Sequence, residues 1–135
     1  MIALALRETQ GQGARDSAAK EYPCPLLIED ARDRGILSDV EAQALYETDL
    51  VVRDRGSEDG TEVYLVVEVS WGVGPYDVER AMRHARALSH IGLATIPVVA
   101  GEHMLPEAYE RACQGQVWQV TDGHAIPPVS ASSSN

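Results

Sequence analysis

The feature that most constrains this chain is a strand–helix–strand pattern spanning residues 62–100. An apolar run at 62–69 is followed by an amphipathic segment at 77–89 and then by a second apolar run at 95–100. The hydrophobic period changes from two residues to about 3.6 residues and back, which predicts strand, helix and strand. Two strands joined in this way normally lie parallel in one sheet, through a right-handed crossover.

Shorter patterns predict the remaining elements. Ser38 and Glu41 have the spacing of a capping box, which predicts that a helix begins at Ser38. Pro97 interrupts the last apolar run and predicts an edge or irregular position for that strand. The other predicted elements are a helix at 25–34 that ends at Gly35, strands at 50–53 and 116–120, a turn at 55–60 with Asp59-Gly60 as a hairpin signal, and a helix at 105–113. We therefore expect an α/β or α+β fold, with a small mixed sheet preceded by a helical hairpin.

The length of 135 residues fits one domain. We place this domain at residues 21–126, with its core at 49–101. Residues 1–20 are mixed in character and predict a poorly ordered arm, and the Pro- and Ser-rich residues 127–135 predict a disordered tail.

Charge and composition exclude some classes of protein. The net charge of −10 argues against a protein that coats nucleic acid, although a local basic patch remains compatible with it. Lys20 is the only lysine. Cys24 and Cys113 fit no metal-ligand spacing and are interpreted as reduced core thiols. No segment has the roughly 18 apolar residues of a membrane span, and the N-terminus lacks a signal-peptide pattern, so we expect a cytoplasmic protein.

Two carboxylates stand at the ends of predicted strands. Glu68 closes the apolar run at 63–67, and Asp49 opens the preceding strand. Side chains alternate along a strand, so Asp49, Glu68 and Ser70 fall on one face if the two strands form a hairpin. One hairpin register sets Asp49 opposite Ser70 and diagonal to Glu68, and another sets Asp49 directly opposite Glu68. Both registers bring the carboxylates close enough to share a divalent cation.

Each carboxylate also has an ordinary structural interpretation. Asp49 is compatible with a turn or cap residue, and Glu68 with a side chain that reaches solvent at the strand tip or forms an ion pair with an arginine. The sequence alone leaves these interpretations open beside the metal site.

The helix after Glu68 carries an apolar stripe and an arginine-rich remainder. Glu79 and Arg83 are spaced for an ion pair along the helix surface. Arg80 and Arg83 are candidates to point at the carboxylates or at a bound phosphate, because a guanidinium suits two oxygens. The apolar stripe comprises Val78, Ala81, Met82, Ala85 and Leu88, and the remainder comprises Asp77, Glu79, Arg80, Arg83, His84 and Arg86.

Aromatic and imidazole side chains give weaker signals. Trp71 and Tyr76 flank the glycine-containing turn, where they are candidates for stacking on a base but are expected to pack. The four histidines show no metal-ligand spacing.

These segments resemble the PD-(D/E)XK, or restriction endonuclease-like, superfamily, and in particular bacterial members with Glu-Val-Ser in place of Glu-X-Lys. The resemblance covers residues 49–101. It rests on four stretches: Asp49-Leu-Val-Val-Arg, Tyr64-Leu-Val-Val-Glu-Val-Ser70, Asp77-Val-Glu-Arg-Ala and Ile96-Pro-Val-Val-Ala-Gly101. The usual first strand of that fold, before the aspartate strand, is not evident here.

The resemblance implies a Mg²⁺- or Mn²⁺-dependent nuclease acting on DNA. It makes Asp49 and Glu68 the metal ligands and puts Ser70 at the lysine position, where a hydroxyl supplies no cation. Arg80 or Arg83 on the following helix then takes the role of the lysine, and Glu47 or Glu41 is the candidate third acid. A catalytically inactive module that binds nucleic acid or protein, and a structural or homodimerisation domain, are the alternative functions.

Overall fold

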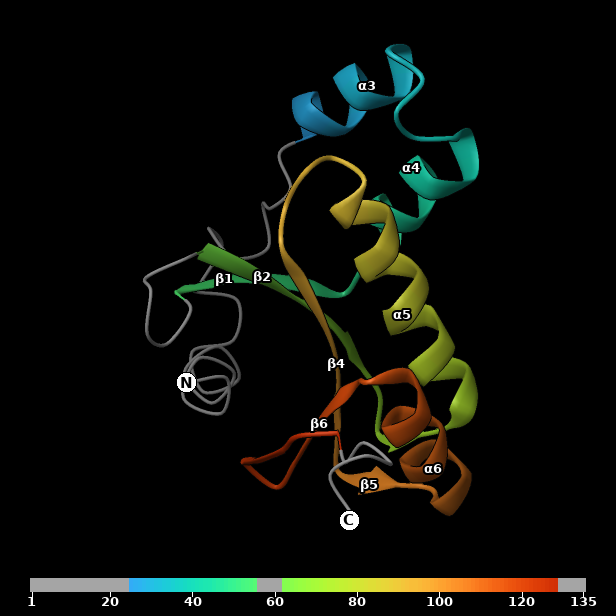
Figure 1. Ribbon diagram of the computed structural model, residues 1–135. Coiled ribbons are helices and arrows are strands. Elements are labelled where there is room, and N and C mark those ends of the chain that lie inside the picture. The colour runs from blue at the N-terminus through green and yellow to red at the C-terminus, as the bar shows by residue number, and fades with distance from the viewer. Residues whose placement is uncertain (1–24, 56–61, 129–135) are drawn as a thin grey trace.

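A five-stranded mixed sheet forms the centre of the fold (Figure 1). The computed structural model describes residues 25–55 and 62–128. Strands β2, β4 and β6 run parallel in the middle, while β1 and β7 pair antiparallel at the two edges. The strands are β1 (Leu50–Arg55), β2 (Glu62–Val69), β4 (Thr95–Gly101), β6 (Trp118–Thr121) and β7 (His124–Ile126). The predicted mixed α/β class and the parallel strand pair are confirmed.

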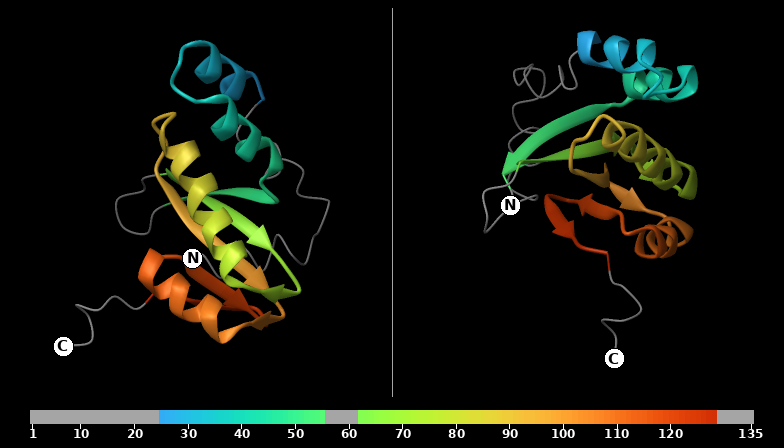
Figure 2. Two further views of the ribbon diagram at one scale, coloured as in Figure 1. Left: turned by 90° about the vertical axis from the view of Figure 1, so that its right-hand side faces the viewer. Right: turned by 45° about the horizontal axis from the view of Figure 1, so that its top comes forward.

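Helices α4, α5 and α6 lie on one side of this sheet (Figures 1 and 2). Helix α5 connects β2 to β4, and α6 connects β4 to β6. The helices are α3 (Pro25–Asp33), α4 (Asp39–Glu47), α5 (Pro75–Ser89) and α6 (Pro106–Gly115). None of the described helices is long and apolar enough to cross a bilayer.

The N-terminal helical hairpin folds as predicted. Gly35 has a φ of 76°, a conformation that glycine adopts readily. It lies two residues after the end of α3, where the chain turns toward α4. The capping box of α4 is formed, because Glu41 donates its backbone N–H to Ser38 Oγ at 3.1 Å and Ser38 donates its own to Glu41 Oε1 at 2.9 Å. Helix α4 ends two residues before Asp49, and no strand precedes β1 within the described part of the chain.

Several short elements were not predicted. Strands β3 (Gly72–Val73) and β5 (His103–Met104) form a separate two-stranded parallel sheet. Strand β7 was missed as well, and the turn before it uses Asp122 and Gly123 at positive φ. Elements of two or three residues have too little periodicity to register as strands.

Several element boundaries also differ from the prediction by one or two residues, among them those of α6 and β6. Helix α5 begins at Pro75 rather than Asp77, because proline suits the first helical turn and Asp77 Oδ2 accepts the free N–H of Gly74 at 2.9 Å. Strand β1 continues to Arg55, two residues past its predicted end. The predicted hairpin turn at Asp59-Gly60, the arm at 1–20 with Lys20, Cys24 and most of the tail lie outside the described residues. Cys113 is free and partly buried.

Pro97 stands in a central strand, so of the two predicted alternatives the edge position is wrong and the irregular pairing is the one observed. Ala100 and Ala94 direct their carbonyls toward β2, which means that Pro97 faces the opposite neighbour, β6. The pairing of β4 with β6 starts only at Val98. Proline therefore removes no ladder hydrogen bond at this position.

The two faces of the sheet carry different apolar clusters. Val52, Leu65 and Val67 share one face with Val98 and Ala100. On the helix-covered face two clusters are centred on α5, one with Val51, Tyr64, Val66 and Leu88 and the other with Val78, Ala81, Val99 and Ala112. The predicted face assignment for β1 and β2 is confirmed, and it places the side chain of Glu68 toward α5.

Candidate functional site

Glu68 is a buried carboxylate between β2 and α5. Its relative exposure is 1%, and both of its oxygens meet cationic or polar groups from α5. Oε2 lies 2.8 Å from Nδ1 of His84, and Oε1 lies 3.2 Å from Nη2 of Arg80. Oε1 nevertheless accepts no hydrogen bond, so its contact with Arg80 is an ion pair of imperfect geometry.

His84 is held in one tautomer by its neighbours. Thr48 Oγ1 lies 3.0 Å from Nδ1 of His84 and donates its only proton to the carbonyl of Ala44 at 3.1 Å. A carboxylate also accepts hydrogen bonds only. We therefore assign the proton to Nδ1, which shares it between Thr48 and Glu68. The C-terminal end of α4 is in this way connected to α5 and to the end of β2.

Asp49 lies just before β1, across from the end of β2. The paired register begins at Leu50, which faces Val67, and its continuation by one residue would set Asp49 against Glu68. This is the second of the two predicted registers. Asp49 is exposed, and its Oδ2 accepts the backbone N–H of Val69 at 2.9 Å. The aspartate thus also ties the two strand ends together.

Ser70 acts locally as a turn residue. Its hydroxyl donates to the carbonyl of Gly72 at 3.1 Å, and its backbone N–H donates to Ala100 at 2.9 Å. A Cβ on Gly101 would lie 2.0 Å from the Ser70 carbonyl oxygen, so only glycine allows β4 to approach this closely. The end of β2 is thereby fixed beside the end of β4.

The two candidate arginines have different surroundings. Arg80 contacts Glu68, as one of the sequence interpretations proposed. Arg83 is exposed, and its predicted ion pair with Glu79 is wrong because Glu79 pairs with Arg111 on α6. The guanidinium carbons of both Arg80 and Arg83 lie 6.0 Å from the centre of the Tyr76 ring. The arginines therefore converge on one aromatic side chain.

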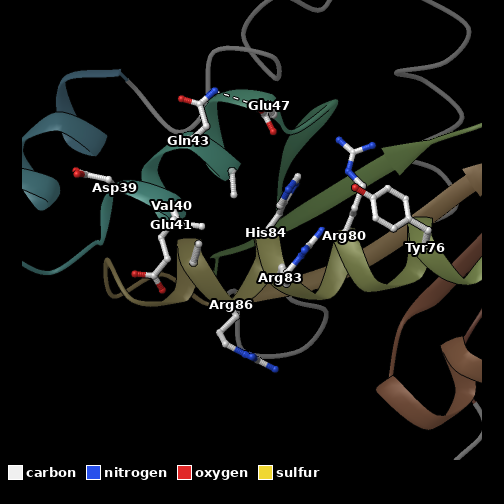
Figure 3. Close-up of a pocket in the computed structure, with 12 residues that line it drawn as sticks. Asp39, Val40, Glu41, Gln43, Glu47, Tyr76, Arg80, Arg83, His84 and Arg86 are labelled. Atoms are coloured by element: carbon white, nitrogen blue, oxygen red, sulfur yellow. Dashed lines mark hydrogen bonds between the residues drawn. The ribbon is translucent and has the colours of Figure 1, made fainter.

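A cleft opens between α4 and α5 beside this network (Figure 3). Its volume is about 610 Å³. Tyr76, Arg80, Arg83, His84 and Arg86 line it from α5. The α4 side supplies Asp39, Val40, Glu41, Gln43, Ala44 and Glu47. One wall of the cleft is thus basic and the other acidic.

Comparison with family models, curated proteins and solved structures finds no match to this chain. The site is therefore interpreted from its own geometry.

Two carboxylate oxygens at this place accept no hydrogen bond from the described residues. Oε1 of Glu68 accepts no hydrogen bond, and Oδ1 of Asp49 has none among the described residues. Hard cations such as Mg²⁺ prefer carboxylate oxygens and take few protein ligands. The donor set therefore fits such an ion, provided that Arg80 turns away from Glu68. The described residues bring no third acid, histidine or cysteine to this place as a ready-made cluster.

The two candidate third acids are engaged elsewhere. Glu41 belongs to the capping box and lies 2.7 Å from His90. The backbone N–H of Ser38, together with His90, holds the pKa of Glu41 below its usual value. Glu47 accepts a hydrogen bond from Gln43 at 3.0 Å.

Sequence reasoning missed three features of the site. His84 was assigned to the solvated face of its helix but is only 2% exposed, and the role of Thr48 was not foreseen. Trp71 and Tyr76 were expected to pack, yet they are 73% and 68% exposed. The available signal for His84 was its distance of four residues from Arg80, which puts both on the side of α5 that faces Glu68.

Proposed function

We propose that this chain is a PD-(D/E)XK-like, metal-dependent phosphodiesterase that acts on DNA. Asp49 and Glu68 are the proposed ligands of Mg²⁺ or Mn²⁺. The observation that carries the proposal is that Asp49, one residue before β1, lies at the end of β2 beside Glu68, whose Oε1 accepts no hydrogen bond and meets only the Arg80 guanidinium. Carboxylates at adjacent strand ends with a nearby guanidinium are suited to phosphate chemistry.

A divalent cation bound at these carboxylates supplies a more acidic water molecule and neutralises charge on the phosphate. The protein's own groups have separate roles in this proposal. His84 keeps the Glu68 carboxylate in place through Nδ1–H, and Thr48 orients the imidazole. The backbone N–H of Val69 keeps the Asp49 carboxylate in place by donating a hydrogen bond to it.

Arg80 takes the part that lysine has in related sites. Its side chain is 26% exposed and lines the cleft, so it has room to leave Glu68. If Arg80 left Glu68, its planar guanidinium would be able to hold two oxygens of a phosphate. Arg80 thus neutralises Glu68 before metal binds and would contact the substrate afterwards.

A second function, binding of nucleic acid or protein without cleavage, is favoured by a specific observation. The Ser70 hydroxyl is committed to the Gly72 carbonyl, and Glu68 is buried against two partners from α5. In this alternative the buried carboxylate is purely structural.

Cleavage of supercoiled plasmid by the purified full chain with Mn²⁺ separates the two functions. We expect nicked and linear products with the natural protein, and none after Glu68→Gln or Asp49→Asn. The matched control is Glu102→Gln, which changes an exposed carboxylate just past β4 and should leave cleavage unchanged. Cleavage that survives Glu68→Gln, or no cleavage by the natural protein, contradicts the phosphodiesterase proposal.

A further inference from the structure

The basic wall of the α4–α5 cleft is a continuous row along one helix. Tyr76, Arg80, Arg83 and Arg86 are separated by four, three and three residues along α5, and in Figure 3 Arg86 extends away from the helix in another direction than Arg80. All four line the same cleft. The row starts next to the Glu68 site and runs away from it toward the end of the helix.

Two arginines of this row lack a carboxylate partner. Arg80 is neutralised by Glu68, whereas Arg83 and Arg86 are exposed and form no ion pair among the described residues. Basic residues are scarce in this chain, with 11 Lys and Arg against 21 Asp and Glu. Two unneutralised guanidiniums therefore make the α5 wall attractive to anions, opposite the carboxylates of Asp39, Glu41 and Glu47 on the α4 wall.

Tyr76 adds a stacking surface to these cations. Its side chain is 68% exposed, and the Arg80 and Arg83 guanidiniums both lie 6.0 Å from its ring centre. An exposed ring beside arginines is the combination by which proteins hold unpaired bases and their phosphates.

The opposite wall limits what the cleft can accept. Asp39 and Glu47 are exposed on α4 and line the cleft across from the arginines. A duplex would bring a second phosphate backbone toward these carboxylates. Phosphates and carboxylates are both negatively charged, so this approach would be repulsive. A single strand needs only the basic wall.

We propose that the α4–α5 cleft binds single-stranded DNA, with a base stacked on Tyr76 and neighbouring phosphates held by Arg83 and Arg86. This inference rests on the proposed function and names its substrate as single-stranded rather than duplex DNA. The strand then passes Arg80 on its way to Asp49 and Glu68.

Binding without metal tests the inference apart from cleavage. The probe is a fluorescently labelled 12-mer of thymidine, compared with the same strand annealed to its adenosine complement, in EDTA and low salt. Anisotropy titration of the full chain should show the single strand bound at least roughly tenfold more tightly than the duplex. Tyr76→Ala should weaken single-strand binding by about five- to 100-fold.

Matched variants identify the surface. Arg83→Gln and Arg86→Gln should each weaken binding and reduce the slope of log affinity against log salt by about 0.7. Tyr109→Ala removes an exposed tyrosine on α6, and Arg34→Gln removes an exposed arginine just after α3; neither should change binding.

The outcomes distinguish this inference from the proposed function. Equal or tighter binding of duplex, equal effects of Tyr76→Ala and Tyr109→Ala, or no binding of either probe overturns the cleft proposal. Plasmid cleavage with no single-strand preference in EDTA overturns the cleft proposal and leaves the phosphodiesterase. Single-strand binding without cleavage in Mn²⁺ supports the cleft and contradicts the phosphodiesterase.

Discussion

Glu68 combines burial with charge, and its neighbours offset the resulting cost. An ionised carboxylate that is 1% exposed is unfavourable unless it is paired and hydrogen-bonded. His84 donates to one oxygen and Arg80 lies beside the other. We therefore expect the contacts of Glu68 with His84 and Arg80 to add little net stability. Removing one partner should nevertheless destabilise the protein, because it leaves a buried charge uncompensated.

Removing one partner should reveal that penalty. His84→Leu leaves the Glu68 carboxylate without its hydrogen-bond donor and should lower the free energy of unfolding by about 3 kcal/mol. Adding Glu68→Met to that variant removes the buried charge and should recover most of the loss. Urea denaturation of the single and double variants measures both effects, and a double variant as unstable as the sum of the single changes would contradict them.

Gly101 controls how closely β4 approaches the end of β2. A Cβ at this position would lie 2.0 Å from the Ser70 carbonyl oxygen, which is backbone and cannot turn aside. Gly101→Ala should therefore destabilise the protein by at least ~2 kcal/mol. Gly72 has open space around it, so Gly72→Ala is the matched control. Equal melting temperatures for the two variants would contradict this account.

At the scale of elements, α5 serves the core and the site at once. Its apolar residues enter both clusters on the helix-covered face of the sheet, while His84 and Arg80 reach Glu68 and Arg83 reaches Tyr76. The 3.6-residue period predicts the apolar stripe well. The period does not indicate which polar residues at the border of the stripe are buried. The burial of His84 depends on the charge of Glu68, which belongs to β2 rather than to α5.

The cap of α4 gives a pH-dependent prediction. Because the backbone N–H of Ser38 holds the pKa of Glu41 below its usual value, ionised Glu41 contributes stability above the unfolded pKa and loses it as pH falls through the folded pKa. Glu41→Gln should thus be less stable than the natural protein at pH 7, by a margin that is smaller at about pH 3. Thermal unfolding at both pH values checks this, and a stability difference that grows on acidification would contradict it.

At the scale of the whole molecule, the sequence predicts the main elements, the parallel β2–β4 pair and the same-face position of Asp49 and Glu68. Strand alternation and helical periodicity are local properties, which explains this success. The hairpin register, the Arg80 contact and the central place of Pro97 depend on which strands become neighbours. Those features arise from packing between distant segments and cannot be derived from local spacing.

Hydrogen exchange should reproduce the layered order of the sheet. Amides of the central strands β2 and β4 are expected to exchange only by global unfolding, because both strands are paired on two sides and largely buried. Amides of β7, a three-residue edge strand, should exchange much faster. Exchange of β2 amides at the rate of β7 amides would contradict this order.

The central claim is that Asp49 and Glu68 together hold a divalent cation, and calorimetric titration of Mn²⁺ tests it most directly. The account predicts saturable binding of one ion per chain, weakened roughly tenfold or more by either Asp49→Asn or Glu68→Gln. Asp122→Asn, which changes an exposed acid after β6, should bind as the natural protein does. Absence of saturable binding, or unchanged affinity in Glu68→Gln, would contradict the claim.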